Sequence, residues 1–167
     1  MPVPMTLDAL NALPAAELHS VLTEVCSSPA WAKTVEASRP WPDPRALLAA
    51  NQEAMAALTP GDLADAMSGH ARIGTPKAGD ATSQREQSGV RGADAALLAE
   101  LSAANAAYEA KFGHVFLICA TGRTAETMLA ALRDRYPNDM DREREIVRGE
   151  LGKINAIRLN RLLGEKA

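Results

Sequence analysis

His70 is the residue of this sequence best placed for acid–base chemistry. It follows Gly69 directly, at the start of an irregular stretch that runs to Asp80 and is rich in glycine and proline. An unperturbed histidine ionises at about pH 6.5, so it can donate or accept a proton near neutral pH. A connection this long inside a compact domain is usually either functional or disordered. The alternative is a solvated loop histidine, which residue type alone favours.

Ser83, Glu86 and Gln87 form a second polar group, on a stretch expected to be a short helix over residues 82–88. Positions three and four apart share a helix face, so a hydroxyl, a carboxylate and an amide would converge. Together they can bind a small polar heterocycle, and the carboxylate can orient His70 or hold a substrate proton. The alternative is an ordinary solvated face. Pairing an imidazole with a carboxylate across one loop favours the acid–base interpretation.

Arg158 continues the apolar stripe that Val147, Leu151 and Ile154 define on the last predicted helix, and Leu162 follows at the next step. An arginine on such a stripe needs an anion, either a protein carboxylate or a bound ligand. The alternative is a side chain that snorkels to solvent near the helix end, and the pattern alone favours it.

The elements that must position these residues are helices with well-marked starts. Three times a capping side chain stands directly before a proline suited to the first helical position, at Ser28-Pro29, Asp43-Pro44 and Thr59-Pro60. A further helical segment begins at Pro14, where apolar residues recur at one-face spacing. The helices expected from caps and spacing cover residues 29–38, 44–58, 60–68, 82–88, 93–112, 124–136 and 139–163.

Glycines and polar residues mark several boundaries. Gly69 is expected to end its helix in a left-handed turn, and Gly113 to stop the helix before it. Asn138 with Asp141 resembles a capping box for the last helix. Residues 115–120 (VFLICA) have the composition of a buried strand but no partner strand. We therefore expect a buried extended segment or the start of a helix there.

Composition favours packed helices. The chain has 167 residues, enough for one ordinary domain, and 47% of them are hydrophobic, many being alanine. Aromatic residues make up only 4%, which disfavours a sandwich of aromatic-rich strands. No repeat or interdomain linker interrupts the chain. The sequence thus predicts an all-α protein, a single-domain compact helical bundle of about seven to nine helices over residues 1–167.

Charge gives no reason to expect nucleic acid or an anionic membrane as a partner, because the net charge is −3 and the pI is about 5.6. The basic residues Arg133, Arg135, Arg142, Arg144 and Arg148 alternate with Asp134, Asp139, Asp141, Glu143 and Glu145, which indicates a solvated charged surface. No apolar run approaches the roughly 20 residues that span a bilayer. With no secretory segment, we expect a cytoplasmic protein.

Cysteine and histidine spacing predicts no metal site. Cys26 and Cys119 lie far apart, and His19 and His114 stand in no zinc-ligand spacing with His70. We expect two reduced thiols and neither a metal nor a cofactor. Any enzymatic chemistry would then be unassisted acid–base chemistry.

Three segments in order resemble the OHCU decarboxylase family. They are residues 69–74 (GHARIG), residues 83–89 (SQREQSG) and residues 112–120 (FGHVFLICA), the last followed by Gly122-Arg123. The likeness extends over nearly the whole chain, including Trp31, the Arg39-Pro40 pair and the long last helix. That family decarboxylates 2-oxo-4-hydroxy-4-carboxy-5-ureidoimidazoline to (S)-allantoin in urate breakdown.

The resemblance implies a role for each matching residue. His70 matches the proton donor of the family, and Glu86 the carboxylate beside it. The resemblance implies substrate binding by Ala71, Ser83, Gln84, Arg85, Glu86, Gln87, Ile118, Cys119, Ala120, Thr121, Gly122 and Arg158. One position departs, because the family usually has proline where this chain has Ala71. Proline restricts the backbone on both sides of its nitrogen, so the loop geometry at His70 is less constrained here.

The implied reaction needs no cofactor if the electrons left by the departing carboxylate spread into the imidazoline ring. The protein then stabilises the developing charge and delivers one proton to one face, which selects one enantiomer. Two alternatives stay open: another cofactor-free acid–base lyase or isomerase of a small carboxylate, and a non-catalytic helical binding module. The oligomeric state also stays open, with a homodimer as one option.

Overall fold

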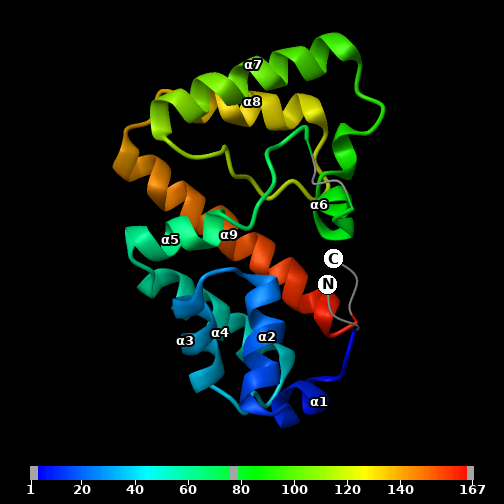
Figure 1. Ribbon diagram of the computed structural model, residues 1–167, viewed down its shortest axis with the longest axis vertical. Coiled ribbons are helices and arrows are strands. Elements are labelled where there is room, and N and C mark those ends of the chain that lie inside the picture. Colours follow the sequence, from blue (N-terminus) through cyan, green and yellow to red (C-terminus); the bar gives the residue numbers. More distant parts are fainter. Residues whose placement is uncertain (1–3, 76–78, 165–167) are drawn as a thin grey trace. The chain divides into compact units, whose positions relative to one another are not determined.

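The computed structural model describes residues 4–75 and 79–164, so residues 76–78 of the predicted irregular stretch lie outside it. The described residues form nine α-helices, one 3-10 helix and no strand (Figure 1), which confirms the all-α prediction. The chain divides into two units, Met1–Gly69 with Leu151–Ala167, and His70–Glu150. The last helix, α9 (Met140–Leu162), begins in the second unit and ends in the first.

The first unit holds the N-terminal helices α1 (Leu7–Ala12), α2 (Ala15–Val25), α3 (Pro29–Ala37), α4 (Pro44–Ala57) and α5 (Pro60–Met67). Helix α3 packs against α2, α4 and α5. Its buried Trp31 donates from Nε1 to Asn51 Oδ1 at 3.0 Å, and Asn51 Nδ2 donates to the carbonyl of Gly152 on α9 at 3.0 Å. These bonds satisfy polar groups that would otherwise be costly to bury.

The predicted helix starts in this unit are confirmed. The side chains of Ser28, Asp43 and Thr59 accept hydrogen bonds from the backbone nitrogens of Trp31, Ala46 and Asp62 at 3.2, 2.8 and 3.2 Å. A proline opens each of these helices, and their C-terminal ends lie one residue before the expected ones. The short helix α1 was not predicted from the sequence.

The predicted left-handed turn at Gly69 is wrong. Helix α5 ends at Met67, its cap Ser68 is right-handed, and Gly69 is not among the glycines with positive φ. A Cβ atom on Gly69 would lie 2.8 Å from the Ser27 hydroxyl oxygen. Glycine is favoured here because a side chain would crowd Ser27, and not because the backbone is left-handed.

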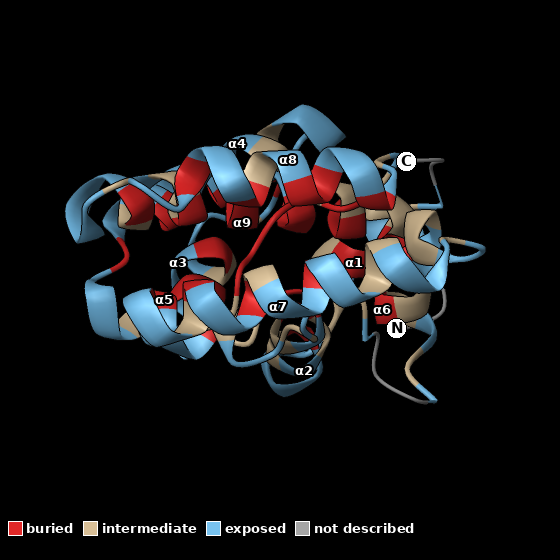
Figure 2. Cartoon of the chain, turned by 90° about the horizontal axis from the view of Figure 1, so that it is seen from above, coloured by how far each residue is buried: buried red, intermediate tan, exposed pale blue. Residues whose placement is uncertain are grey.

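The second unit contains α6 (Ala81–Glu86), the 3-10 helix η1 (Ser88–Val90), α7 (Ala95–Phe112), α8 (Ala125–Arg135) and the first part of α9. Helices α7 and α8 pack along each other (Figure 1). Buried and exposed residues alternate along both of them (Figure 2), as expected of amphipathic helices. Their core contains Leu101, Tyr108, Phe112, Phe116, Ile118, Met128, Leu129 and Leu132.

Gly113 ends α7 with φ +79°, so its predicted role as the stop is confirmed. The run 115–120 is neither strand nor helix, which confirms the expected buried extended segment. The predicted capping box of the last helix is wrong. Asp139 caps α9, since its Oδ1 accepts from Arg142 N at 2.8 Å. Asn138 instead donates from Nδ2 to Glu143 Oε2 at 3.1 Å.

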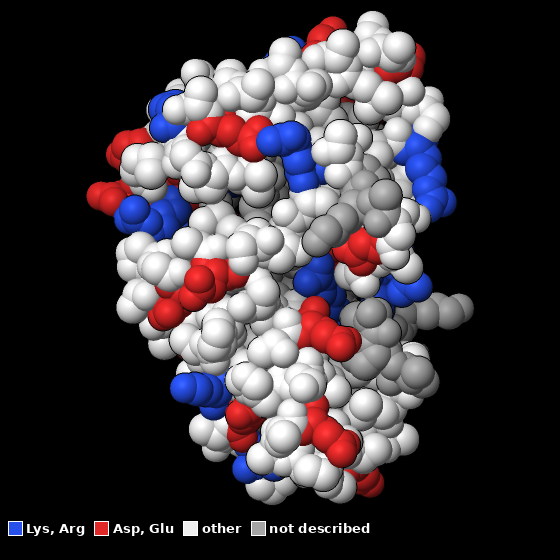
Figure 3. All heavy atoms as spheres, in the orientation of Figure 1, with Lys and Arg blue, Asp and Glu red and all other residues white. Residues whose placement is uncertain are grey.

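Within the described ranges, none of the helices has the length and apolar character needed to cross a bilayer. Basic and acidic side chains are interspersed on the face drawn in Figure 3.

Candidate active site

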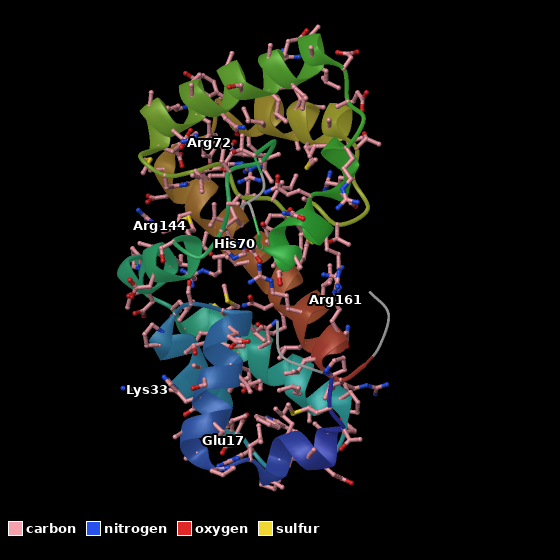
Figure 4. All side chains as sticks on the ribbon, turned by 45° about the vertical axis from the view of Figure 1, so that its right-hand side comes forward. Glu17, Lys33, His70, Arg72, Arg144 and Arg161 are labelled. Atoms are coloured by element: carbon pink, nitrogen blue, oxygen red, sulfur yellow. The ribbon has the colours of Figure 1, made fainter. Side chains whose placement is uncertain are left out.

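All of the predicted site residues except Arg158 fall in the second unit. They lie on three segments: the loop that begins at His70, helix α6 with its cap, and the extended segment with the turn that follows it. Figure 4 labels His70 and Arg72 on the loop. Each segment is held by contacts that can be named.

The His70 loop is fastened to α7. Ile73 is buried, and its carbonyl oxygen accepts a hydrogen bond from Asn105 Nδ2 at 2.8 Å. Arg72 forms a two-pronged ion pair with Glu109, with Nε to Oε2 at 3.0 Å and a terminal nitrogen to Oε1 at 2.7 Å. Asn105 and Glu109 are four residues apart and so lie on one helix face. His70 itself is half-buried.

The side chain of Gln87 fastens the same loop to the end of α6. Its Oε1 accepts from Gly74 N at 3.0 Å, and its Nε2 donates to the carbonyl oxygens of Arg72 at 3.2 Å and Ala71 at 3.4 Å. Gln87 is the C-terminal cap of α6 and is buried. The loop therefore does not depend on a proline at position 71 for all of its order.

Asp80 caps the N-terminus of helix α6, and its side chain accepts from Thr82 N at 3.1 Å. Ser83 and Glu86, three residues apart, are buried at 6% and 8% exposure, whereas Arg85 is exposed. The helix thus turns the hydroxyl and the carboxylate inward, as the spacing predicts. Gln87 lies one residue beyond the helix, as its C-terminal cap. Of the three residues expected to share a helix face, only Ser83 and Glu86 are therefore helical.

The extended segment is held through its backbone. Glu150, a buried residue of α9, accepts from Cys119 N at 3.2 Å. Arg135 donates from a terminal guanidinium nitrogen to the carbonyl of Leu117 at 2.9 Å. The segment ends in a turn in which Arg123 N donates to Ala120 O at 3.0 Å, with Gly122 at φ +78°. These side chains satisfy backbone groups that a neighbouring strand would otherwise pair.

Arg135 and Glu143 form a buried ion pair, which corrects the prediction that both belong to a solvated surface. Arg135 contacts Glu143 Oε1 from Nε at 2.8 Å and from a terminal nitrogen at 2.5 Å. The Tyr108 hydroxyl donates to the same oxygen at 2.6 Å. The guanidinium also lies over the Phe116 ring, 4.5 Å from its centroid. Charge alternation along the chain hid this pair, because burial is set by tertiary packing.

The network shifts the acidity of its members. Burial, followed by the hydrogen bond to Glu143 and its negative charge, raises the pKa of the Tyr108 hydroxyl far above its ordinary value. Burial also acts to raise the pKa of the Glu143 carboxyl. The hydrogen bonds from Arg135, Tyr108 and Asn138 outweigh it, so that pKa lies below its ordinary value. Glu143 is therefore an anion and Tyr108 a neutral donor at neutral pH.

Gly89 brings the α6 region against the turn after the extended segment. A Cβ atom at this position would lie 1.7 Å from the carbonyl oxygen of Arg123 and 3.3 Å from the Cα atom of Thr124. Only a residue without a side chain permits this approach. Gly89 thus joins the segment that carries Glu86 to the one that carries residues 118–122.

Arg158 lies in the first unit, on α9. It is buried, with 7% exposure, so the snorkelling interpretation is wrong. One terminal nitrogen donates to the carbonyl of Val25, the last residue of α2, at 2.8 Å. A cation at a helix C-terminus is favourable. The neighbouring Cys26 is a free buried thiol whose pKa is raised by burial.

Sequence reasoning missed Asn105 and Glu150, which hold two of the site segments. Asn105 lies on α7 between apolar positions, and a polar residue on an apolar face was the available signal. Glu150 stands three residues after Val147 and four before Ile154, so a polar residue at the spacing of the buried face was the available signal there too. Among the described residues, no group of three His, Cys, Asp or Glu side chains is arranged to hold a metal ion.

These features define a class: an all-α protein with a histidine loop, a buried carboxylate on a short helix, and a backbone-anchored segment in one unit. Residues 11–160 match the sequence model of OHCU decarboxylase, and the chain belongs to that family.

Two curated relatives are similar in sequence. The uric acid degradation bifunctional protein TTL of Arabidopsis thaliana is 32% identical over 149 residues, covering 85% of this chain and 46% of that protein. The 2-oxo-4-hydroxy-4-carboxy-5-ureidoimidazoline decarboxylase of Amia calva is 32% identical over 80 residues, covering 48% of this chain and 46% of that protein. The chain therefore spans about half the length of the curated relatives it matches.

Two solved structures are similar in fold. A crystal structure of OHCU decarboxylase in the presence of (S)-allantoin superposes with a TM-score of 0.73 at 30% identity, covering 86% of this chain and 96% of that one. A structure of (S)-allantoin synthase gives a TM-score of 0.75 at 20% identity, covering 95% of this chain and 54% of that one, and shows the shared fold.

Proposed function

We propose that this chain decarboxylates 2-oxo-4-hydroxy-4-carboxy-5-ureidoimidazoline to (S)-allantoin and CO2 in urate breakdown, without a cofactor or a metal. His70 is the proton donor and Glu86 assists it. Membership of the OHCU decarboxylase family supports the substrate class, as does the crystallised relative described with (S)-allantoin.

One observation carries the proposal. The loop that begins at His70 and the helix that ends at Glu86 are fastened to each other within one unit by the side chain of Gln87. An imidazole and a buried carboxylate on segments joined in this way suit acid–base chemistry, which requires a donor and a partner held at fixed spacing.

The chemistry has two steps in this proposal. Cleavage of the bond to the carboxylate releases CO2 and leaves an electron pair that spreads into the imidazoline ring. His70 then delivers a proton, from one face only, to the neighbouring ring carbon that bears the ureido group. The hydroxyl on the carbon that lost the carboxylate gives up its proton and becomes a ring carbonyl, so the product is one enantiomer. Glu86 holds the imidazole or the substrate proton in position.

Substrate contacts are proposed for the residues that the family resemblance marks. The loop and α6 contribute Ala71, Ser83, Gln84, Arg85 and Glu86, and the extended segment with its turn contributes Ile118, Cys119, Ala120, Thr121 and Gly122. The hydroxyl of Ser83 and the backbone groups near Gly122 suit the polar ring and the ureido group. Arg158 is proposed as a contact for the substrate anion, because its planar guanidinium can bind a carboxylate with two bonds.

The proposed partner is this small molecule alone, with neither nucleic acid nor membrane, and the proposed location is the cytoplasm. Acidic and basic side chains are interspersed on the face drawn in Figure 3. A homodimer is the oligomeric state to test. In the described chain, the exposed large hydrophobic side chains are Tyr136 and Met140, where a second copy would be sought.

The test uses freshly generated substrate and follows the product by circular dichroism, which separates enzymatic (S)-allantoin from the racemic product of spontaneous decay. His70→Asn should retain the fold and lose turnover by about 10²–10⁴-fold, the usual contribution of a general acid–base group. His19→Asn is the matched control. Its imidazole contacts Glu36 in the first unit, so that variant should turn over normally.

Near-normal (S)-allantoin production by folded His70→Asn protein would remove His70 from the mechanism. An unmodified chain that leaves the substrate to decay spontaneously would refute the decarboxylase proposal itself. Turnover of a different small carboxylate would then favour another acid–base lyase or isomerase. Absence of any turnover, with a urea-like molecule bound, would favour a binding module.

A further inference from the structure

We propose that Gln87 is a positioning residue: its side-chain amide fixes the loop that carries His70 against the end of the helix that carries Glu86. This inference rests on the proposed function, and it differs from the expectation that the Gln87 side chain binds substrate.

The amide of Gln87 has little hydrogen-bonding capacity left for a ligand. A primary amide offers two N–H donors and one carbonyl oxygen with two lone pairs. Nε2 donates to the loop carbonyls of Ala71 and Arg72, and the oxygen accepts from Gly74 N. The side chain is also buried, with 4% exposure. Binding a substrate carbonyl through Nε2 would require giving up a bond to the loop.

The positions of these bonds assign the role. The bonded backbone groups belong to residues one, two and four places after His70, and Gln87 itself follows Glu86 directly. The amide therefore sets the spacing between the two segments that carry the proposed acid–base pair. Asn105 and Glu109 hold the same loop to α7, whereas Gln87 holds it to the end of α6. Misplacing a reacting group by about 1 Å can cost roughly 100-fold in rate.

The hydrogen bonds from Gln87 matter for the loop that begins at His70 because the residue after His70 does not restrict the backbone. Ala71 leaves the backbone next to His70 without the restriction that a proline would impose. The hydrogen bond to the Ala71 carbonyl and the two beyond it supply order that the residue type does not.

The experiment replaces the amide without changing its volume much. Gln87→Met removes both donors and the acceptor and keeps a side chain of similar length. We expect kcat to fall about 10–100-fold, KM and the affinity for (S)-allantoin to stay within about twofold, and amide hydrogen exchange at Gly74 to accelerate. The matched control is Gln52→Met, an exposed glutamine of α4 in the first unit, which should leave all four measurements unchanged.

The outcomes separate the possible roles. If kcat is unchanged, or if affinity for (S)-allantoin falls in step with kcat, the positioning role is overturned, in the second case in favour of direct contact. A lower melting temperature with normal kcat in the folded fraction assigns a purely structural role and also overturns it. If Gln87→Met fails to fold, Gln87→Asn, which keeps the amide but is one methylene shorter, carries the same measurements.

The exchange measurement separates this inference from the proposed function. If the unmodified chain produces no (S)-allantoin, the proposed function fails. Faster exchange at Gly74 in Gln87→Met would still support the tie between loop and helix. Unchanged exchange at Gly74 overturns the positioning role even if decarboxylation is established.

Discussion

Gly89→Ala adds a single methyl group, yet we expect it to lower both the stability and the activity of this protein, because the structure leaves no room for that group. The new Cβ would lie 1.7 Å from the carbonyl oxygen of Arg123 and 2.9 Å from its carbonyl carbon. A carbon atom and a carbonyl oxygen in close contact are normally about 3.3–3.6 Å apart. The two backbone segments must therefore separate by roughly 1.6 Å or more. Neither contact is with a flexible side chain that can turn away.

The displacement acts where the proposed site is assembled. Gly89 follows Glu86 by three residues, and Arg123 directly follows the turn at Gly122. Crowding of this kind typically costs about 1–3 kcal/mol of stability. A shift above 1 Å between site segments costs roughly 100-fold in rate. We expect Gly89→Ala to fold with a melting temperature several degrees lower and with kcat reduced by roughly that factor.

The assay measures thermal unfolding and (S)-allantoin production on the same preparation. Gly149→Ala is the matched control, because a Cβ there would meet nothing within 4 Å and the residue lies inside α9. That variant should be more stable by about 0.5–1 kcal/mol, since alanine is the better helix former, with normal kcat. A Gly89→Ala protein with unchanged stability and kcat would refute the close approach.

Three further predictions concern individual side chains and one concerns the whole chain. Glu86→Gln should lower kcat by about 10²–10⁴-fold if Glu86 assists proton transfer, whereas Glu126→Gln, an exposed carboxylate of α8, should not. Glu143→Gln should destabilise the protein by about 3–5 kcal/mol, because it leaves a buried arginine uncompensated. Since the pKa of Glu143 is lowered in the folded state, the ionised carboxylate's contribution is complete above its ordinary value of 4.5 and is lost as the pH falls through the lowered value. The difference in unfolding free energy between the two proteins should therefore shrink in strong acid, and a constant difference would contradict the assignment. Arg158→Lys should raise KM with kcat nearly unchanged if Arg158 binds the substrate anion, whereas a lower melting temperature with normal constants would assign it a structural role that includes its bond to the Val25 carbonyl. We also propose one domain over residues 1–167, because α9 runs unbroken through both units; calorimetry should show a single transition, and two separate ones would contradict it.

Local rules predicted most of the helices. Caps and first-turn prolines act within one turn, so Ser28, Asp43 and Thr59 could be assigned from the sequence and were confirmed within a residue at the helix ends. The left-handed stop at Gly113 was predictable for the same reason. Gly69 also follows a predicted helix in the sequence, as Gly113 does. Its backbone is not left-handed, however, and what disfavours a side chain there is the nearby Ser27 hydroxyl, a tertiary neighbour that no local pattern reveals.

The candidate site was predictable in its residue types but not in its supports. Helical spacing identified the buried pair of Ser83 and Glu86 on α6. It could not identify Asn105, whose partner is a loop carbonyl 32 residues earlier, or the burial of Arg135 with Glu143. Alternating charges along a sequence predict a solvated surface, and only the tertiary packing shows which of them are buried. Long-range contacts of this kind depend on the completed fold.

The way in which the extended segment is held has a consequence for protein engineering. The side chains of Arg135 and Glu150 form hydrogen bonds with its backbone, Arg135 with the carbonyl of Leu117 and Glu150 with the amide of Cys119. These anchors do not depend on which side chains the segment carries. Positions such as Cys119 and Thr121 can therefore be varied in a library with the main-chain path preserved, which would make this segment, through its proposed substrate contacts, a place to redesign substrate preference.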